Sequence, residues 1–336
     1  MSIFRRNFRV IASIALIFVL FSLTGCGSVS KTPDSGAGGK SSAIKLRIGY
    51  PVGSLTKELF LQTGIDKGIF AKYGLEVEGE DYSVGGQIIQ DLAGGNLDVG
   101  IVGPSPALIG AAQGVDLKIV ASGIKNYCPL VARKGINSIK ELNGKKVGTP
   151  GVSSIEETML NYLESQQGIK TKHVYANVAN LTEMLDKGEL DAIVPWEPVA
   201  ADTVAKVAGA HYLLDTILPN AEAADITVPG KFFRDNPNTI VSFLKAAEEI
   251  RQYILKHTDE RVKAAAQITG LPESVIAESI RRSHEFTTPL QINMDSIKLI
   301  ASSDIASGKL RGIDQNGLNS FLAKNIDSAL LQQALQ

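Results

Sequence analysis

The sequence has few of the residues that catalysis and metal binding use. Its 336 residues include two cysteines, one tryptophan and four histidines. The histidines share no ligand spacing such as HxxxH, no CxxC pair is present, and neither a GxSxG elbow nor a Walker phosphate loop occurs. The sequence therefore predicts a protein that is not an enzyme and that has no catalytic residues, no metal site and no cofactor.

An excess charge of one sign is also lacking. The 34 lysines and arginines nearly balance the 35 aspartates and glutamates, so the net charge is −1. Nucleic-acid-binding proteins usually carry a basic excess, so we expect no nucleic-acid partner. A chain of this length with 44% hydrophobic residues can bury a large core and form more than one domain.

Only one hydrophobic run stands out, and it is short. Three arginines precede about 14 apolar residues that begin at Val10, and the run ends in the sequence LTGC at Cys26. A basic start, an apolar centre and small residues before a cleavage site are typical of a bacterial export signal, whereas a membrane-spanning helix needs about 20 apolar residues. The LTGC end resembles a lipobox. We therefore expect residues 1–25 to be a signal peptide and Cys26 to carry a lipid anchor.

The segment after the lipidation site predicts a tether. Residues 26–43 are rich in glycine and serine and show no apolar periodicity, so we expect a lipidated flexible linker that reaches about 20–25 Å. Loss of the signal leaves 31 basic against 35 acidic residues, a net charge of −4. Cys128 is then the one unmodified cysteine, which excludes an intramolecular disulfide.

Beyond the tether, predicted strands alternate with predicted helices. Strands are expected at 45–50, 75–77, 99–102, 118–121, 129–133, 146–148, 173–176, 192–194 and 211–214. Helices are expected at 56–70, 87–93, 107–113, 138–142, 154–167, 181–187 and 199–208. This alternation predicts an α/β fold with mainly parallel sheets, in which ligands bind beyond the carboxyl ends of the strands. The C-terminal part predicts helices with a packing role, at 238–257, 259–268, 273–284, 293–307 and 316–334.

Two segments of the α/β part resemble each other. GGNLDVGIVGPSP (94–106) and KGELDAIVPWEP (187–198) both contain Gly-x-Leu-Asp, a short apolar strand and a proline-containing loop. A helix that ends at glycine and a strand that ends in a stiff loop explain this pattern. The repetition indicates two similarly built lobes, although helix–glycine–strand junctions are common in α/β folds.

A helix start in the middle of the chain is a candidate for ligand binding. In KKVGTPGVSSIEETML (145–160), Ser153 with Glu156, or Ser154 with Glu157, has the spacing of a capping box. The free N–H groups and the dipole of a helix start can hold one polar end of a small ligand. A well-capped helix with a purely structural role is the alternative.

Two other features allow both a ligand-binding and a structural interpretation. Trp196 and Glu197 lie between two prolines in a loop at a strand end, where the indole face can cover a ligand and the carboxylate can bind a donor. A tryptophan packed in the core is the alternative. The run Gly85-Gly86-Gln87 allows the backbone to approach a ligand closely, or forms only a tight turn.

The motifs together resemble a known family. They are LTGC, RIGY at the start of the domain, GIFAKYGLEVE (68–78), GGQIIQDLAGGNLDVGIVGPSPAL (85–108), SIKELNGKKVGTPGVSS (138–154) and GELDAIVPWEP (188–198). Their order over most of residues 45–215 resembles the substrate-binding lipoproteins of ABC transporters in the nitrate/sulfonate/taurine (NMT1/THI5-like) group. That group also includes proteins that bind thiamine-precursor pyrimidines and other small heterocycles.

The resemblance implies a two-lobed type II periplasmic-binding-protein fold. Each lobe would be a mainly parallel sheet flanked by helices, with 44–124 and 223–336 in lobe 1, 125–222 in lobe 2, and two crossovers between them. It implies a monomer, lipid-anchored on the extracytoplasmic side of the cell membrane (periplasm or cell surface), that closes on a solute like a hinged clamp and delivers it to an ABC permease with its ATPase. The ligand contacts that it implies are Ser54, Gly85, Gly86, Gln87, Pro104, Ser105, Asn126, Tyr127, Cys128, Gly151, Ser153, Ser154, Trp196 and Glu197.

The charges near these residues leave the ligand open. Nitrate, sulfonates and taurine have an anionic end, yet Glu156, Glu157 and Glu197 lie close to the expected site in the sequence, and the nearest cations are Lys57 and Lys125. Carboxylates oppose an anion, so a neutral or zwitterionic organic ligand competes with a simple anion. An enzyme on the same fold and a membrane-tethered sensor are the alternative functions.

Overall fold

The computed structural model describes residues 43–125, 128–284 and 286–336. All of them belong to one compact unit, Ser41–Gln336. The predicted signal peptide, the tether with Cys26, and the candidate contacts Asn126 and Tyr127 lie outside the described residues. Within the described part, no helix is long and apolar enough to cross a membrane.

The first sheet, sheet A, contains four strands from the N-terminal part of the described chain and one later strand, β10, that follows the second sheet. Its order is β2-β1-β3-β10-β4, with β1 parallel to β2 and β3, and β10 antiparallel to β3 and β4. The strands are β1 (Ile44–Pro51), β2 (Leu75–Tyr82), β3 (Val99–Val102), β4 (Leu117–Lys125) and β10 (Glu222–Pro229). The helices between them are η1 (Thr56–Leu61), α1 (Gln62–Asp66), α2 (Ile69–Lys72), α3 (Gly85–Gly94) and α4 (Pro104–Ala112).

The second sheet, sheet B, lies entirely within the middle of the chain. Its order is β7-β6-β8-β5-β9, and it repeats the mixed pattern with β6 parallel to β7 and β8. The strands are β5 (Leu130–Ala132), β6 (Lys146–Thr149), β7 (Lys172–Tyr175), β8 (Ala192–Ile193) and β9 (His211–Leu214). The helices are η2 (Ile139–Leu142), α5 (Ile155–Gln167), α6 (Val178–Asp186) and α7 (Val199–Lys206).

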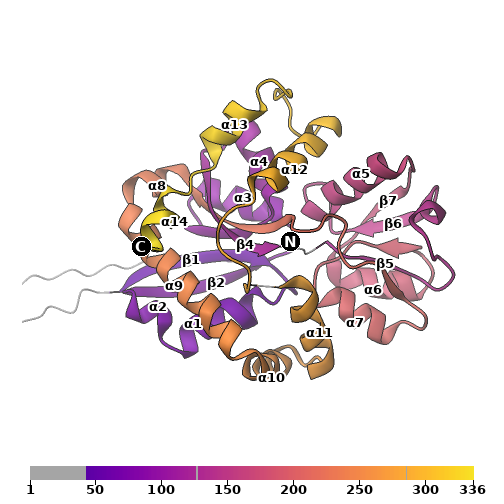
Figure 1. The fold of residues 1–336 in the computed structure, drawn as a ribbon, viewed down its shortest axis with the longest axis horizontal. Helices are drawn as coiled ribbons and strands as arrows, with labels where there is room; N and C mark the ends of the chain where they lie inside the picture. The colour runs from indigo at the N-terminus through magenta and orange to yellow at the C-terminus, as the bar shows by residue number, and fades with distance from the viewer. Residues whose placement is uncertain (1–42, 126–127, 285) are drawn as a thin grey trace, which may run out of the picture. The chain divides into compact units, whose positions relative to one another are not determined.

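The chain leaves sheet A after β4 and returns to it in β10, so two crossovers join the sheets (Figure 1). This confirms the predicted two-lobed α/β fold. The sheets are mixed and not mainly parallel as predicted, because β10 in sheet A and β5 in sheet B run antiparallel to both of their neighbours. We call the parts built on the two sheets lobe A and lobe B; the predicted lobe boundaries stay a prediction. The remaining helices follow β10 and are α8 (Gly230–Asp235), α9 (Pro237–Lys256), α10 (Thr258–Thr269), α11 (Glu273–Ser283), α12 (Met294–Ala306), α13 (Leu318–Asn325) and α14 (Ala329–Ala334).

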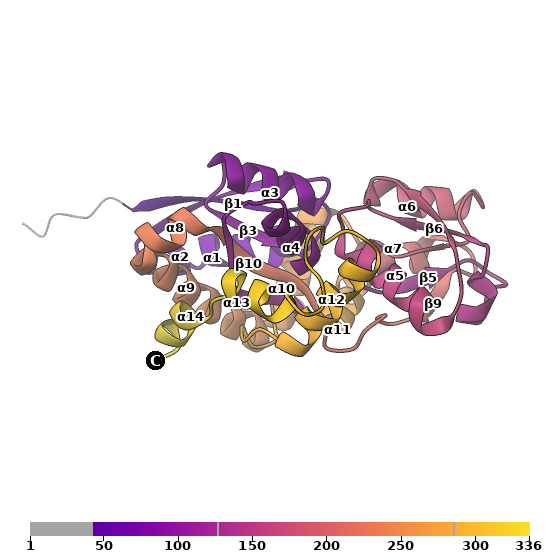
Figure 2. The same ribbon diagram turned by 90° about the horizontal axis from the view of Figure 1, so that it is seen from above.

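The C-terminal helices contact both lobes. Helix α12 packs against α4 of lobe A and α5 of lobe B, and α11 packs against α7 of lobe B. Figure 2 shows α12 beside α4 and α5, where the two lobes meet. The expectation that this part of the chain only supports the fold is therefore incomplete, because its helices also connect the lobes.

Several elements differ from the sequence prediction. The predicted helix 56–70 consists of η1, α1 and α2, and α8 was not predicted. Strand β10 was not predicted, because all but the last of its residues are buried and it lacks the alternation of a half-exposed strand. The predicted helix 316–334 is two helices, because Ile326 between them leaves the helical conformation and forms a β-bridge with Ile119.

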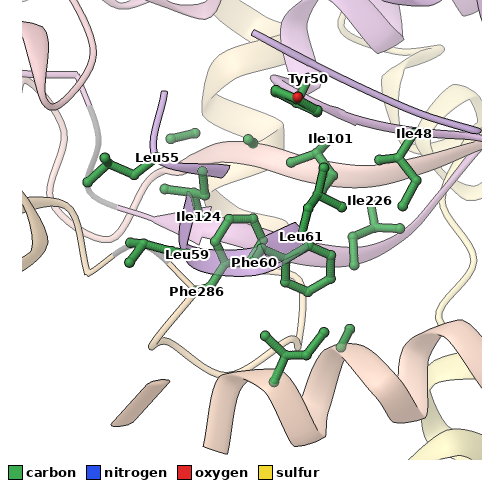
Figure 3. Packing of buried hydrophobic residues seen from close by; sticks show 14 of the residues in the cluster. Ile48, Tyr50, Leu55, Leu59, Phe60, Leu61, Ile101, Ile124, Ile226 and Phe286 are labelled. Atoms are coloured by element: carbon green, nitrogen blue, oxygen red, sulfur yellow. The ribbon is translucent and has the colours of Figure 1, made fainter. Parts of the chain in front are cut away.

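An aromatic cluster packs against sheet A and supports its strands. The rings of Phe60 and Phe286 stack with centroids 4.5 Å apart, and Phe70 and Phe243 extend the cluster. Figure 3 shows Phe60 and Phe286 near Ile101 of β3 and Ile226 of β10. Burial of each such side chain stabilises the fold by about 1.5–3 kcal/mol, so the strand ends rest on a rigid core.

The two similar sequence segments occupy equivalent places in the two lobes. Asp98 accepts hydrogen bonds from Arg47 at 2.9–3.0 Å in lobe A, and Asp191 accepts from Arg133 at 2.6 and 2.9 Å in lobe B. The preceding glycines, Gly95 and Gly188, both have positive φ, at 74° and 71°. Each segment thus ends a helix, pairs an aspartate with an arginine and leads into a strand whose end faces the other lobe.

Candidate functional site

A cavity of about 470 Å³, measured with the part that opens to solvent, lies between the two lobes. Its wall consists of strand ends and helix starts, which is where the α/β prediction placed the ligand site. The lining residues from lobe A and β10 are Pro51, Ser54, Thr56, Gly85, Val102, Gly103, Pro106, Ile124, Ala223 and Ala224. Those from lobe B are Ser154, Ile155, Glu156 and Trp196.

Ser154 begins the helix on the lobe B side of the cavity. It is the N-cap of α5, and its Oγ accepts a hydrogen bond from the backbone N–H of Glu157 at 3.1 Å. Of the two predicted capping pairs, the structure therefore forms Ser154 with Glu157. Only half of the capping box is present, because the N–H of Ser154 donates to the carbonyl oxygen of Gly151 at 3.0 Å.

Glu156 belongs to the wall of the cavity. Its side chain is only 3% exposed, and burial raises its pKa to about 7, although its own backbone N–H and the Ser154 hydroxyl act to lower the pKa. No lysine, arginine or histidine in the described part of the chain forms an ion pair with it. Glu156 is therefore a buried acid that changes charge near neutral pH and faces empty space.

Glu157 is equally buried but lies in a dense polar network away from the cavity. Its carboxylate accepts from the Thr149 hydroxyl at 3.0 Å and the Tyr175 hydroxyl at 3.1 Å, and it pairs with His173 Nδ1 at 2.7 Å. Burial acts to raise the pKa of Glu157, but the hydrogen bond and charge of His173 outweigh burial and hold the pKa below its usual value. His173 also pairs with Glu164 at 2.9 Å.

Trp196 closes the cavity from the loop after β8. The side chain is 4% exposed, and among the described residues its indole Nε1 has no hydrogen-bond partner. A buried polar group without a partner costs about 1–3 kcal/mol, so a ligand atom that accepts from Nε1 would remove this cost. The ring also packs in the hydrophobic core, as the structural interpretation of Trp196 expects, and the ligand-binding interpretation stays a prediction.

Glu197 turns away from the cavity. Its carboxylate accepts from the Tyr212 hydroxyl at 2.7 Å, from the backbone N–H of Ala201 at 2.9 Å and from the Ser279 hydroxyl at 3.3 Å. Burial raises its pKa, and the Tyr212 hydrogen bond acts against this. These contacts connect the loop to α7, β9 and α11, so the hydrogen bonds of Glu197 stabilise the fold around the loop.

Twelve of the fourteen predicted contacts lie in the described residues, and they fall into three groups. Of the fourteen residues, the structure brings Ser54, Gly85, Ser154 and Trp196 together in the cavity wall. Gly86 and Ser153 face each other across the lobes, since a Cβ on Gly86 would lie 3.4 Å from Ser153 Oγ. The remaining described ones lie outside the wall: Gln87, Pro104, Ser105, Cys128, Gly151 and Glu197. Cys128 packs in the core of lobe B, where burial raises the pKa of its thiol.

The sequence prediction missed several residues of the wall. Glu156 was treated as a charge that opposes an anion and not as a contact. Ala223 and Ala224 were missed because β10 was not predicted, and their small side chains leave room beside Gly103. At Gly103 a Cβ would approach Ile155 to 3.0 Å and the carbonyl oxygen of Ala223 to 3.2 Å, so only glycine allows this contact between the lobes without a shift.

A buried polar cluster joins the lobes at α4, α5 and α12. Asp304, with 0% exposure, accepts from the hydroxyls of Ser105 and Thr158 at 2.6 Å each, and Lys309 Nζ lies 3.1 Å from Thr158 Oγ1 and 3.9 Å from Asp304. Burial raises the pKa of Asp304 and lowers the pKa of Lys309. Ser105, predicted as a ligand contact, thus belongs to the contact between the lobes.

The other hollows in the described residues differ from this cavity in their polar groups. One between α6 and α7 contains a buried oxygen without a partner, Asp202 Oδ1, but the other oxygen of that carboxylate pairs with Lys206 Nζ at 2.7 Å. A wider one of about 1080 Å³ lies between α5 and α12, but none of its lining atoms is a buried polar group that lacks a partner. The described residues also contain no group of His, Cys, Asp and Glu side chains that could hold a metal ion. The cavity between the lobes is therefore the candidate site.

Comparison with known proteins decides the family. A family model described as NMT1/THI5 like matches residues 57–261, more than half of the chain. The chain belongs to this family. It is 27% identical to the putative aliphatic sulfonates-binding protein of Bacillus subtilis (strain 168) over 94% of this chain and 92% of that protein. It is also 27% identical to the taurine-binding periplasmic protein of Escherichia coli (strain K12), over 66% and 73% of the two chains.

Solved structures show the same fold. The ligand-binding component of an ABC-type import system from Staphylococcus aureus matches with a TM-score of 0.71 at 15% identity, over 87% of this chain and 99% of that chain. The periplasmic aliphatic sulphonate binding protein SsuA from Escherichia coli matches with a TM-score of 0.65 at 23% identity, over 81% and 95%. The relatives are named as binding proteins, and these solved structures, at 15% and 23% identity, show that the chain shares their fold.

Proposed function

We propose that this protein is an extracytoplasmic solute-binding protein that delivers a small organic solute to an ABC importer, and that the solute binds in the cavity between the lobes. The observation that carries the proposal is the buried, unpaired Nε1 of Trp196 in the wall of that cavity. A native protein rarely leaves such a group unpaired, and a bound solute supplies the missing acceptor. The names of the relatives support solute binding, and the structural neighbour from an ABC-type import system supports a role in import.

The two lobes explain how binding could be signalled to a permease. A solute in the cavity contacts lobe A through Ser54 and Gly85 and lobe B through Ser154 and Trp196. A ligand that touches both lobes binds the closed arrangement more tightly than an open one, and this difference shifts the population toward the closed state. A permease that recognises the closed arrangement then selects the loaded protein.

The nature of the solute follows from the relatives and the wall. Relatives named as sulfonate- and taurine-binding proteins support a sulfonate-like solute, and the indole of Trp196 supports a small heterocycle as the alternative. We propose that a lipid on Cys26 anchors the protein. Cys26→Ala should then yield an unprocessed precursor without lipid, as measured by lipid labelling, whereas unchanged labelling would contradict the anchor.

A thermal-shift screen tests the proposed function. The panel contains nitrate, taurine, alkyl and aryl sulfonates, amino acids, pyrimidines, riboflavin and polyamines. A solute present at 100 times its dissociation constant adds about 2.7 kcal/mol to the free energy of unfolding, so a true ligand should raise the melting temperature clearly. A binding role would be contradicted if no solute of the panel raised the melting temperature and the protein converted one of them to a product.

A further inference from the structure

The cavity wall contains no cation that could neutralise an anionic solute. None of the described lining residues is a lysine, an arginine or a histidine. The two cations that are nearest in the sequence lie elsewhere. Lys57 is exposed, and Lys125 Nζ donates to the carbonyl oxygens of Pro289 at 3.2 Å and Gln291 at 2.7 Å. A buried anion would therefore have to rely on neutral donors alone.

The helix start in the wall is already satisfied by the chain itself. The backbone N–H of Glu157 donates to Ser154 Oγ, and the Glu156 carboxylate accepts from the N–H of its own residue. A helix start attracts an anion because its N–H groups are free and positively polarised. Here a carboxylate of the protein occupies that position, so an anionic ligand would meet a like charge and not a free donor.

Two polar groups in the same wall have opposite requirements. Trp196 Nε1 is a donor that lacks an acceptor, while the Glu156 carboxylate is an acceptor in a wall without cations. A solute that satisfies both needs an acceptor atom and a donor group. Donation from an ammonium group to a carboxylate is charge-assisted and is about twice as strong as a neutral hydrogen bond.

We propose that Glu156 makes the cavity selective for solutes that carry a hydrogen-bond donor, above all an ammonium group, and that it rejects anions that lack one. The proposal rests on the proposed function, since it assigns the solute class of the same cavity. It separates taurine-like and other donor-bearing solutes from nitrate and simple alkanesulfonates. An anion without a donor leaves the buried carboxylate with only its own backbone N–H and the Ser154 hydroxyl as partners, and adds a like charge beside it.

A set of isosteric solutes tests the donor requirement. Taurine, isethionate and propane-1-sulfonate share one sulfonate and one chain and end in an ammonium, a hydroxyl and a methyl group. Benzylamine, benzyl alcohol and ethylbenzene repeat the comparison on an aromatic body. Titration of the purified full-length protein, followed by the fluorescence of Trp196, the only tryptophan in the sequence, gives the affinities at the cavity.

The expected order of affinity is ammonium, then hydroxyl, then the solute without a donor, with about 10- to 100-fold between the first and the last. Glu156→Gln should reduce this ratio to near one. Glu157→Gln is the matched control, because it removes a charge from the same helix turn but outside the cavity wall, and it should leave the ratio unchanged among folded molecules.

Two results would overturn the proposal in distinguishable ways. Propane-1-sulfonate that binds as tightly as taurine, or a ratio that Glu156→Gln does not change, would contradict the donor requirement and leave the proposed function standing. No binding in either series, with Trp196 fluorescence unchanged throughout, would contradict both the donor requirement and the role of the cavity as a solute site.

Discussion

Glu156 and Glu157 are consecutive residues of α5, each 3% exposed, yet their surroundings differ completely. Glu157 binds Thr149, His173 and Tyr175, and its pKa lies below the usual value. Glu156 faces the cavity, and burial raises its pKa to about 7. Equal burial therefore says little about the role of a charged side chain. The number of partners decides whether the side chain stabilises the empty protein or waits for a ligand.

The same distinction separates two regions of the contact between the lobes. In the polar cluster, Asp304 has Ser105, Thr158 and Lys309 as partners, so this region can hold the lobes together without a solute. In the cavity, Trp196 Nε1 has no partner in the described structure, and we propose that a solute supplies one. We expect substitutions in the first region to change stability and substitutions in the second to change binding.

The largest effect should follow from Asp304→Ala. The substitution removes the acceptor of two buried hydroxyls and the ion-pair partner of Lys309. Loss of one partner of a buried charged pair typically costs about 3–5 kcal/mol. Urea unfolding measures the free energy of unfolding, and Asp304→Asn should lose less because the amide oxygen still accepts. A loss below about 1 kcal/mol for Asp304→Ala would show that the cluster does not stabilise the protein.

Glu157→Gln should destabilise the protein by about 2–4 kcal/mol, because it removes the charge that pairs with His173. The pKa of Glu157 is lowered by folding, so its contribution is lost as the pH falls below about 4.5. The pKa of His173 is raised chiefly by its hydrogen bond to Glu157, so its contribution is complete below pH 6.5 and is lost as the pH rises through the folded value. The cost of Glu157→Gln should therefore be greatest between these pH values.

Glu156→Gln should have the opposite sign and raise the free energy of unfolding at pH 8 by about 1–3 kcal/mol. The folded pKa of about 7 exceeds the ordinary value of 4.5, so stability is lost as the pH rises through this interval, and the neutral glutamine avoids the loss. Burial raises the pKa of the Cys128 thiol, and the nearby charge of Glu156 raises that pKa further. Unfolding curves at pH 5 and pH 8 measure the effect, and destabilisation at pH 8 would contradict the assignment of Glu156 to the cavity.

Trp196→Phe should have the smallest effect, about 1 kcal/mol on solute affinity, because it removes only the Nε1 donor and keeps an aromatic ring. The free energy of unfolding of the empty protein should not decrease, since the lost donor has no partner among the described residues. Calorimetric titration and urea unfolding measure the two quantities. A loss of stability with unchanged affinity would assign the indole to the core alone.

The sequence predicted the parts of this arrangement that depend on local patterns. Alternating strands and helices placed the ligand site at strand ends, and Trp196 and Ser154 do line the cavity there. The capping-box pattern fitted both Ser153 with Glu156 and Ser154 with Glu157. Since neighbouring residues of a helix point about 100° apart, only one of the two glutamates can face the cavity, and the pattern could not tell which. The contact of Ser105 with Asp304 joins residues far apart in the chain, and no local pattern indicates it.

A crystal structure with the solute that binds most tightly in the screen would test the role of the cavity most directly. We predict that the solute lies between the lobes, with an acceptor atom on Trp196 Nε1 and a donor on the Glu156 carboxylate. A solute bound in the hollow between α5 and α12, or one held in the cavity with Trp196 Nε1 still unpaired and no donor at Glu156, would contradict this assignment.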